Sequence, residues 1–100
     1  MIKHIVCWRL NESAYGNDKQ TNAQILKEKL LAMQGKVKGL LKVEVGLDFS
    51  NENDSCDVVL YSEFTIKEAL HQYQIHPDHE DIKKWIGEVR SERRVVDYEV

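Results

Sequence analysis

The spacing of apolar residues limits this chain to a small set of folds. Over residues 1–10 the spacing alternates, so one face of an expected strand carries Ile2, His4, Val6, Trp8 and Leu10. The same alternation predicts further strands at residues 41–49, 56–64 and 93–100. Between the strands the period becomes helical, first over residues 18–36 and then after residue 64, where Pro77 breaks the helical stretch and starts a new helix.

The resulting order of elements, βαββααβ, is that of a ferredoxin-like α+β fold, with one antiparallel four-stranded sheet under helices. The chain has 100 residues and no internal repeat, linker or low-complexity segment, so we expect one domain over residues 1–100. Hydrophobic residues make up 42% of the chain, which is enough for one core. Because so short a domain buries a modest fraction of its surface, a second copy would add stability.

Charge and cysteine content exclude several classes of protein. The net charge of −3, from 14 basic and 17 acidic residues, is unlike the basic surface of a nucleic-acid-binding protein. No apolar run approaches the length of a membrane span, so we expect no membrane partner. Cys7 and Cys56 are isolated from each other in sequence, which indicates free thiols and a cytoplasmic location.

The sheet face away from the helices has a mixed composition. By alternation it carries Val95 and the apolar or half-polar residues Ile5, Cys7, Val59 and Tyr61, among charged residues such as Lys3 and Glu63. We predict a homodimer with these four residues at the interface, because packing sheet on sheet would bury them. The alternative is an antiparallel sheet with one half-solvated face, which is common.

Chemistry is most plausible around three residues. His79 follows Pro77, Tyr73 is on the inward stripe of the preceding helix, and His4 shares a strand face with Val6 and Trp8. We expect these side chains to converge on one pocket, where a neutral imidazole could act as a base and a tyrosine could hold a carbonyl oxygen. Structural roles are the alternative, with His76 capping the helix that begins at Pro77 and His4 as a satisfied core residue.

Other chemical signals are weak. His76 and His79 lack the further nitrogen or sulfur ligands of a zinc site, and no nucleotide or cofactor motif is present, so we expect neither a metal nor a cofactor. The mixed charge run Arg90-Ser91-Glu92-Arg93-Arg94 is typical of a solvated helix end.

Several segments together resemble the stress-responsive α/β-barrel (Dabb) family. They are Met1–Val6, the segment Phe64–Tyr73, the motif Ile75-His76-Pro77-Asp78-His79 and the closing Val96-Asp97-Tyr98. The resemblance covers nearly the whole chain. It implies a ferredoxin-like subunit whose sheet packs against a second copy to form a dimeric α+β barrel.

The same resemblance implies the site residues. In a plant polyketide cyclase of this family a histidine and a tyrosine catalyse an aldol condensation, and they correspond to His79 and Tyr73, with His4 as the first-strand histidine. The implied pocket residues are Val6, Trp8, Leu60, Ser62 and Ile82. Two positions depart from the cyclase: Val58 replaces a histidine, and Trp8 is large enough to fill the cavity.

Most members of the family have no assigned reaction. We therefore expect a homodimer of undefined biochemical activity, with a pocket for a small apolar or aromatic ligand. The alternatives are a cofactor-free cyclase or lyase that uses the His-Tyr pair, and a cofactor-free monooxygenase of the dimeric α+β barrel type.

Overall fold

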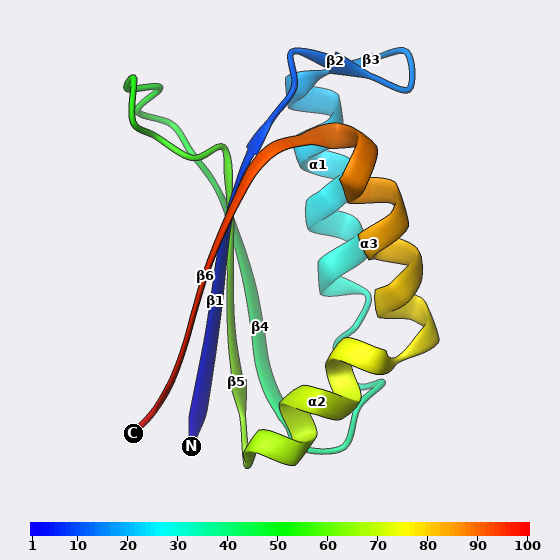
Figure 1. Cartoon of the computed structure of the whole chain (residues 1–100), viewed down its shortest axis with the longest axis vertical. Coiled ribbons are helices and arrows are strands. Elements are labelled where there is room, and N and C mark those ends of the chain that lie inside the picture. Colours follow the sequence, from blue (N-terminus) through cyan, green and yellow to red (C-terminus); the bar gives the residue numbers. More distant parts are fainter.

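The computed structural model describes residues 1–100 and has helices on one side of a four-stranded antiparallel sheet (Figure 1). The strands of this sheet are β1 (Ile2–Leu10), β4 (Leu40–Leu47), β5 (Val58–Phe64) and β6 (Arg90–Glu99), in the spatial order β4-β5-β1-β6. The helices are α1 (Lys19–Leu31), α2 (Lys67–Ile75) and α3 (Pro77–Val89). This arrangement confirms the predicted ferredoxin-like α+β fold. None of the helices is long and apolar enough to cross a membrane.

A small hairpin, in a segment where no strand was predicted, precedes α1. Its strands are β2 (Ser13–Ala14) and β3 (Asn17–Asp18), joined by Tyr15 and Gly16 with positive φ angles of 52° and 75°. Two consecutive residues with positive φ are the geometry of a type I′ turn, in which glycine is favoured. The hairpin leads directly into α1, whose first turn is capped by the Asp18 carboxylate accepting from the Thr21 N–H.

Burial alternates strictly along β1 and β5, because their residues point in turn toward the helices and away from them. The helix-facing residues form the core with α1, α2 and α3. The opposite side, which we call the outer face, is covered by no helix (Figure 1). Strand pairing places Tyr61, Ile5 and Val96 in one row across the outer face, and Val59, Cys7 and Arg94 in the next.

The first helix is shorter than its periodicity predicted. It ends at Leu31 instead of residue 36, and turns follow it, with φ angles of +84° at Gly35 and +89° at Gly39. Met33 and Val37 are nevertheless buried in the core from this non-helical segment. The apolar spacing therefore continued past the helix because these turns pack against the same core.

The last strand begins at Arg90, directly after α3, and not at residue 93. The charge run of residues 90–94 is thus the first half of β6, and its expected role as a solvated helix end is wrong. Val95 was predicted on the outer face, but it pairs with Val6 and faces the helices, whereas Val96 has the outer position. The alternation of apolar and polar residues could not show which of the two faces the helices, because Val95 and Val96 are both apolar.

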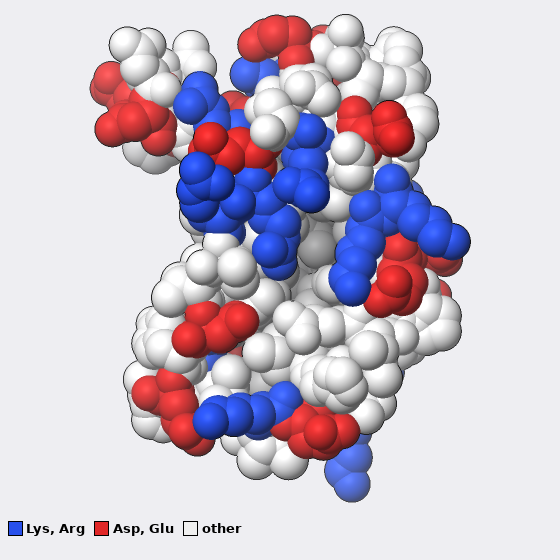
Figure 2. All heavy atoms as spheres, in the orientation of Figure 1, with Lys and Arg blue, Asp and Glu red and all other residues white.

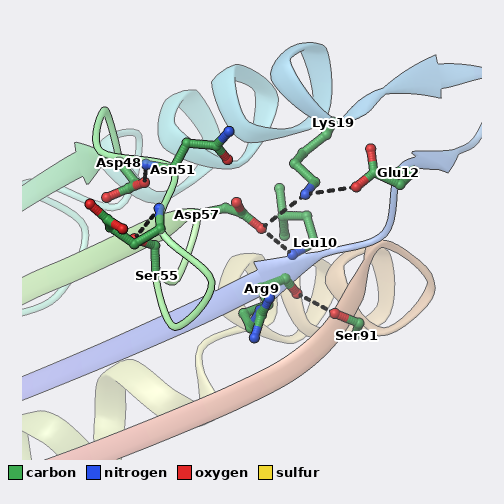
Figure 3. A network of polar contacts seen from close by, with 10 residues as sticks. Arg9, Leu10, Glu12, Lys19, Asp48, Asn51, Ser55, Asp57 and Ser91 are labelled. Atoms are coloured by element: carbon green, nitrogen blue, oxygen red, sulfur yellow. Dashed lines mark hydrogen bonds and ion pairs between the residues drawn. The ribbon is translucent and has the colours of Figure 1, made fainter.

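A polar network holds β1, β5 and β6 together at the end of the sheet far from both termini (Figure 3). The Leu10 N–H donates to Oδ2 of Asp57 over 2.7 Å, and the Ser91 hydroxyl donates to the Arg9 carbonyl over 3.3 Å. The pairing of β1 with β6 shifts between Arg9 and Leu10. Side chains thus satisfy backbone groups at this bulge, beyond which β6 runs in regular register past β1.

Candidate functional site

A cavity of about 600 Å³ lies between the sheet and the helices. This volume falls in the ordinary range for pockets that bind small molecules. The residues around it come from β1, β5, β6 and the three helices: His4, Val6, Trp8, Leu30, Leu60, His71, Gln74, Ile75, His79, Ile82, Lys83, Ile86, Arg90 and Arg93.

Four of the five expected pocket residues line this cavity, namely Val6, Trp8, Leu60 and Ile82. The fifth, Ser62, is fully buried and does not line it, since its hydroxyl donates to the His4 carbonyl over 2.8 Å. Trp8 forms part of the wall and leaves the cavity open. Its indole N–H is buried without an acceptor from the protein, which is an energetically unfavourable state for a donor.

His79 is placed by the chain break at Pro77. Pro77 begins α3, and Nδ1 of His76 accepts from the Asp78 N–H over 3.0 Å, which caps this helix as the structural reading of His76 expected. One turn into α3, Nδ1 of His79 donates to the Gln74 carbonyl over 3.2 Å. A carbonyl only accepts, so Nδ1 carries the proton and Nε2 keeps its lone pair in the neutral ring.

The surroundings of His79 keep it neutral. Burial, and secondarily the charge of Lys83, lower its pKa from 6.5 to about 4. At neutral pH the ring is therefore an uncharged base that lines the cavity. A base with so low a pKa is weaker than one whose pKa lies near neutral pH. Negative charge brought close to the ring would raise this pKa and so strengthen the base.

His4 also borders the cavity, and it has a partner that the sequence analysis did not assign. Nδ1 of His4 is hydrogen-bonded to the Asp97 carboxylate, which pairs with it across β1 and β6. The carboxylate accepts from the Nδ1–H group, so the bond fixes the orientation of the ring. The other ring nitrogen, Nε2, takes no part in this bond. His4 is thus both a core residue with a satisfied partner and a wall of the cavity.

Tyr73 lies behind His79. Its ring centroid is 4.5 Å from that of His79, 5.3 Å from Phe64 and 6.3 Å from His4. The side chain is fully buried, its hydroxyl has no hydrogen-bond partner, and it does not line the cavity. Burial raises the pKa of Tyr73, so the phenol stays protonated. The three expected site residues therefore form one aromatic cluster, of which His4 and His79 border the cavity.

The charged wall of the cavity was not predicted from the sequence; it consists of Lys83, Arg90 and Arg93. Lys83 is four residues after His79 on α3, a spacing that could have placed both on one helix face. Arg93 pairs with Trp8 across β6 and β1, a register that depends on the bulge near Leu10 and has no local sequence signal. No group of three or more His, Cys, Asp or Glu side chains is placed to bind a metal ion.

An open sheet backed by three helices, with a ligand-sized cavity between the layers, defines the class: a ferredoxin-like α+β protein with an internal pocket. Residues 2–100 match the family of the stress responsive A/B barrel domain, Dabb. The chain belongs to this family, as the resemblance in its sequence indicated. No functionally curated protein matches it significantly.

Solved structures agree with this assignment. A dimeric protein of unknown function with a ferredoxin-like fold from Bacteroides fragilis is 32% identical, with a TM-score of 0.85 over 99% of this chain and 95% of that one. A hydroxynitrile lyase from Passiflora edulis is 14% identical, with a TM-score of 0.81 over 99% and 92% of the two chains. An antibiotic biosynthesis monooxygenase is 16% identical, with a TM-score of 0.76 over 100% and 98%. The last two likenesses show the fold alone.

Proposed function

We propose that this chain acts as a homodimer that binds a small apolar or aromatic ligand in the cavity between sheet and helices. The cavity of about 600 Å³ is the observation that carries the ligand-binding part, because its volume suits a small molecule and its wall includes Val6, Leu60 and Ile82. The proposal includes no specific reaction. The dimeric relative from Bacteroides fragilis is likewise a protein of unknown function.

The outer face supports the dimer. Ile5, Cys7, Val59 and Tyr61 are only half-buried in the single chain, and Val96 beside Ile5 is 52% exposed. Charged side chains surround this apolar centre, with Lys3 and Lys42 each 5.7 Å from the ring centroid of Tyr61. An apolar centre with a charged rim is typical of a protein–protein interface, and the same face would meet itself in a two-fold dimer.

Tyr61→Glu tests this interface. The variant removes the aromatic ring from the interface and adds a carboxylate, which must be desolvated when the two sheets pack together even though Lys3 and Lys42 lie nearby. We expect light scattering at micromolar concentration to show a dimer for the wild type and a monomer for the variant. Tyr15→Glu is the matched control, because Tyr15 is exposed on the β2–β3 turn. A monomeric wild type, or a Tyr61→Glu dimer of unchanged affinity, would contradict the proposed interface.

Ligand binding is tested by thermal unfolding in the presence of small aromatic compounds. A ligand present at 100 times its Kd stabilises the folded state by about 2.7 kcal/mol, which raises Tm by more than about 10 °C in a domain of this size. Ile82→Phe would fill part of the cavity and reduce the shift, whereas Ile66→Phe changes an exposed position and would not. Equal shifts in the two variants would place the ligand elsewhere.

A cofactor-free lyase or cyclase is the second candidate, favoured by the neutral Nε2 of His79 at the cavity wall. In such a reaction His79 takes a proton from the ligand and returns it later in the turnover. The Asp97–His4 pair supplies a second imidazole held in fixed orientation. Tyr73, proposed from the sequence as the donor to a carbonyl oxygen, packs against His79 and acts in the present geometry as a positioning residue.

Mandelonitrile is a suitable probe for this candidate. Removal of its hydroxyl proton by His79 would release benzaldehyde and cyanide, and the cyanide takes up the proton. We expect benzaldehyde release above the buffer rate from the wild type and none from His79→Asn, which retains an amide donor for the Gln74 carbonyl. An inactive wild type would exclude cyanohydrin cleavage, and an active His79→Asn dimer would move the base elsewhere. The third alternative, a cofactor-free monooxygenase, is supported only by likeness of fold. The hydroxynitrile lyase resembles this chain in fold to a similar degree, so the likeness does not favour the monooxygenase.

A further inference from the structure

We propose that the cavity selects a ligand with an anionic head group, a carboxylate or a phosphate, attached to an apolar or aromatic body. The inference rests on the proposed ligand-binding function and names the class of ligand. Its basis is the separation of charge around the cavity. Every ionised side chain in the wall at neutral pH is a cation, Lys83, Arg90 or Arg93, and no aspartate or glutamate lines the cavity. Lys83 is paired with Glu80 at 2.9 Å, so the two arginines carry the argument. The chain as a whole has more acidic than basic residues.

The two arginines of the wall have no carboxylate partner in the protein. Arg94 is the arginine that forms an ion pair, with Glu92 at 3.6 Å, and neither Arg90 nor Arg93 has a carboxylate within ion-pair distance. The carboxylate of Asp97, on the same side of β6 as Arg93, is bonded to His4. A guanidinium group without a partner beside a cavity is a ready site for a carboxylate or a phosphate, which it can bind through two parallel hydrogen bonds.

The fold places these cations at the mouth of the cavity and not inside it. Arg93 pairs with Trp8, so it is on the helix side of β6, and Lys83 lies across from it on α3. Figure 2 shows a hollow near the middle of this face with Lys and Arg side chains on both of its sides. Lys83, Arg90 and Arg93 are exposed, which lets a charged head group remain partly hydrated.

The interior of the cavity is suited to the rest of such a ligand. Val6, Leu60 and Ile82 are buried apolar residues of its wall. The side chain of Trp8 adds an aromatic part to the same wall. The side chains therefore change from apolar within the cavity to cationic at its mouth, which matches a ligand that is apolar at one end and anionic at the other.

Two exposed cations provide a matched pair of variants. Arg93→Gln removes a cation from the cavity wall. Lys84→Gln removes the same charge from an exposed position of α3 that lines neither the cavity nor the outer face. Both side chains are exposed, so we expect both variants to fold, which thermal unfolding checks.

The experiment titrates the protein with 4-phenylbutyrate, 4-phenylbutan-1-ol and 4-phenylbutyl phosphate while the two tryptophan indole N–H resonances are followed by NMR. Trp8 lines the cavity and reports binding there, whereas Trp85 stacks on Tyr15 and is the internal control. We expect the wild type to bind one or both anions at least about tenfold more tightly than the alcohol. Comparison of the carboxylate with the phosphate identifies the preferred head group.

The variants then decide whether Arg93 causes the preference. We expect Arg93→Gln to lose roughly tenfold in affinity for the anion and to bind the alcohol as before, whereas Lys84→Gln retains both affinities. Equal affinity of the wild type for the alcohol and both anions would overturn the anionic class and leave ligand binding in place. An equal loss in both variants would also overturn it. No response of Trp8 to any of the three probes at millimolar concentration would overturn the ligand-binding function as well.

Discussion

Acidification should destabilise this protein through His79. The pKa of His79 is lowered from 6.5 to about 4, first by burial and then by the charge of Lys83. Between these two values the unfolded chain binds a proton at this residue and the folded chain does not. The stability that comes from the neutral ring is therefore complete above pH 6.5 and is lost as the pH falls toward 4.

The magnitude follows from the two pKa values. A pKa difference of this size corresponds to about 3 kcal/mol in the free energy of unfolding, at about 1.4 kcal/mol per pKa unit. His79 is only partly buried, so solvent screens part of this effect. We expect about 1–2 kcal/mol of the loss between pH 7.5 and pH 4.5 to come from this single residue.

Urea unfolding at pH 7.5 and pH 4.5, at one fixed protein concentration, measures this loss. His79→Asn removes the titrating ring and retains a donor for the Gln74 carbonyl, so its stability should fall by about 1–2 kcal/mol less than that of the wild type. Contributions from carboxylates cancel in this difference because both proteins share them. His71→Asn, at an exposed histidine, should behave as the wild type does. Equal losses in wild type and His79→Asn would refute the environment assigned to His79.

The sequence predicted the fold well because the fold depends on local periodicity. Alternation in β1, β4 and β5 and the break at Pro77 define the order of elements without any distant contact. The errors occurred where the spacing of apolar residues did not correspond to the local secondary structure. Met33 and Val37 continue the helical spacing of α1, although they lie in turns. The adjacent residues Val95 and Val96 are both apolar, so the sequence did not indicate which of them faces the helices.

The candidate site was predictable only in part, for a related reason. His4, Tyr73 and His79 lie on faces that local patterns assign, and they form one cluster in the fold. The partner of His4 and the cations of the cavity mouth depend on how β6 pairs with β1, since that pairing brings Asp97 to His4 and Arg93 to Trp8. A register between strands more than 80 residues apart cannot be read from either strand alone, because it is set by the bulge near Leu10.

Three substitutions test the packing around the buried Tyr73 hydroxyl and around the turns that precede β4. Tyr73→Phe removes a buried hydroxyl that has no hydrogen-bond partner, so we expect thermal unfolding to show unchanged or increased stability, by up to about 1 kcal/mol; a clear loss would mean that the hydroxyl has a partner. At Gly39, where φ is +89°, an added Cβ would lie 2.7 Å from both Ala69 Cβ and Thr65 Oγ1, so Gly39→Ala should lose about 2–4 kcal/mol in urea unfolding. Gly35 has a similar φ of +84° but open space around its Cβ position, so Gly35→Ala should show only the backbone cost of about 1–2 kcal/mol. Equal losses at the two glycines would mean that backbone strain accounts for both, and that the segment before β4 is free to move away from α2.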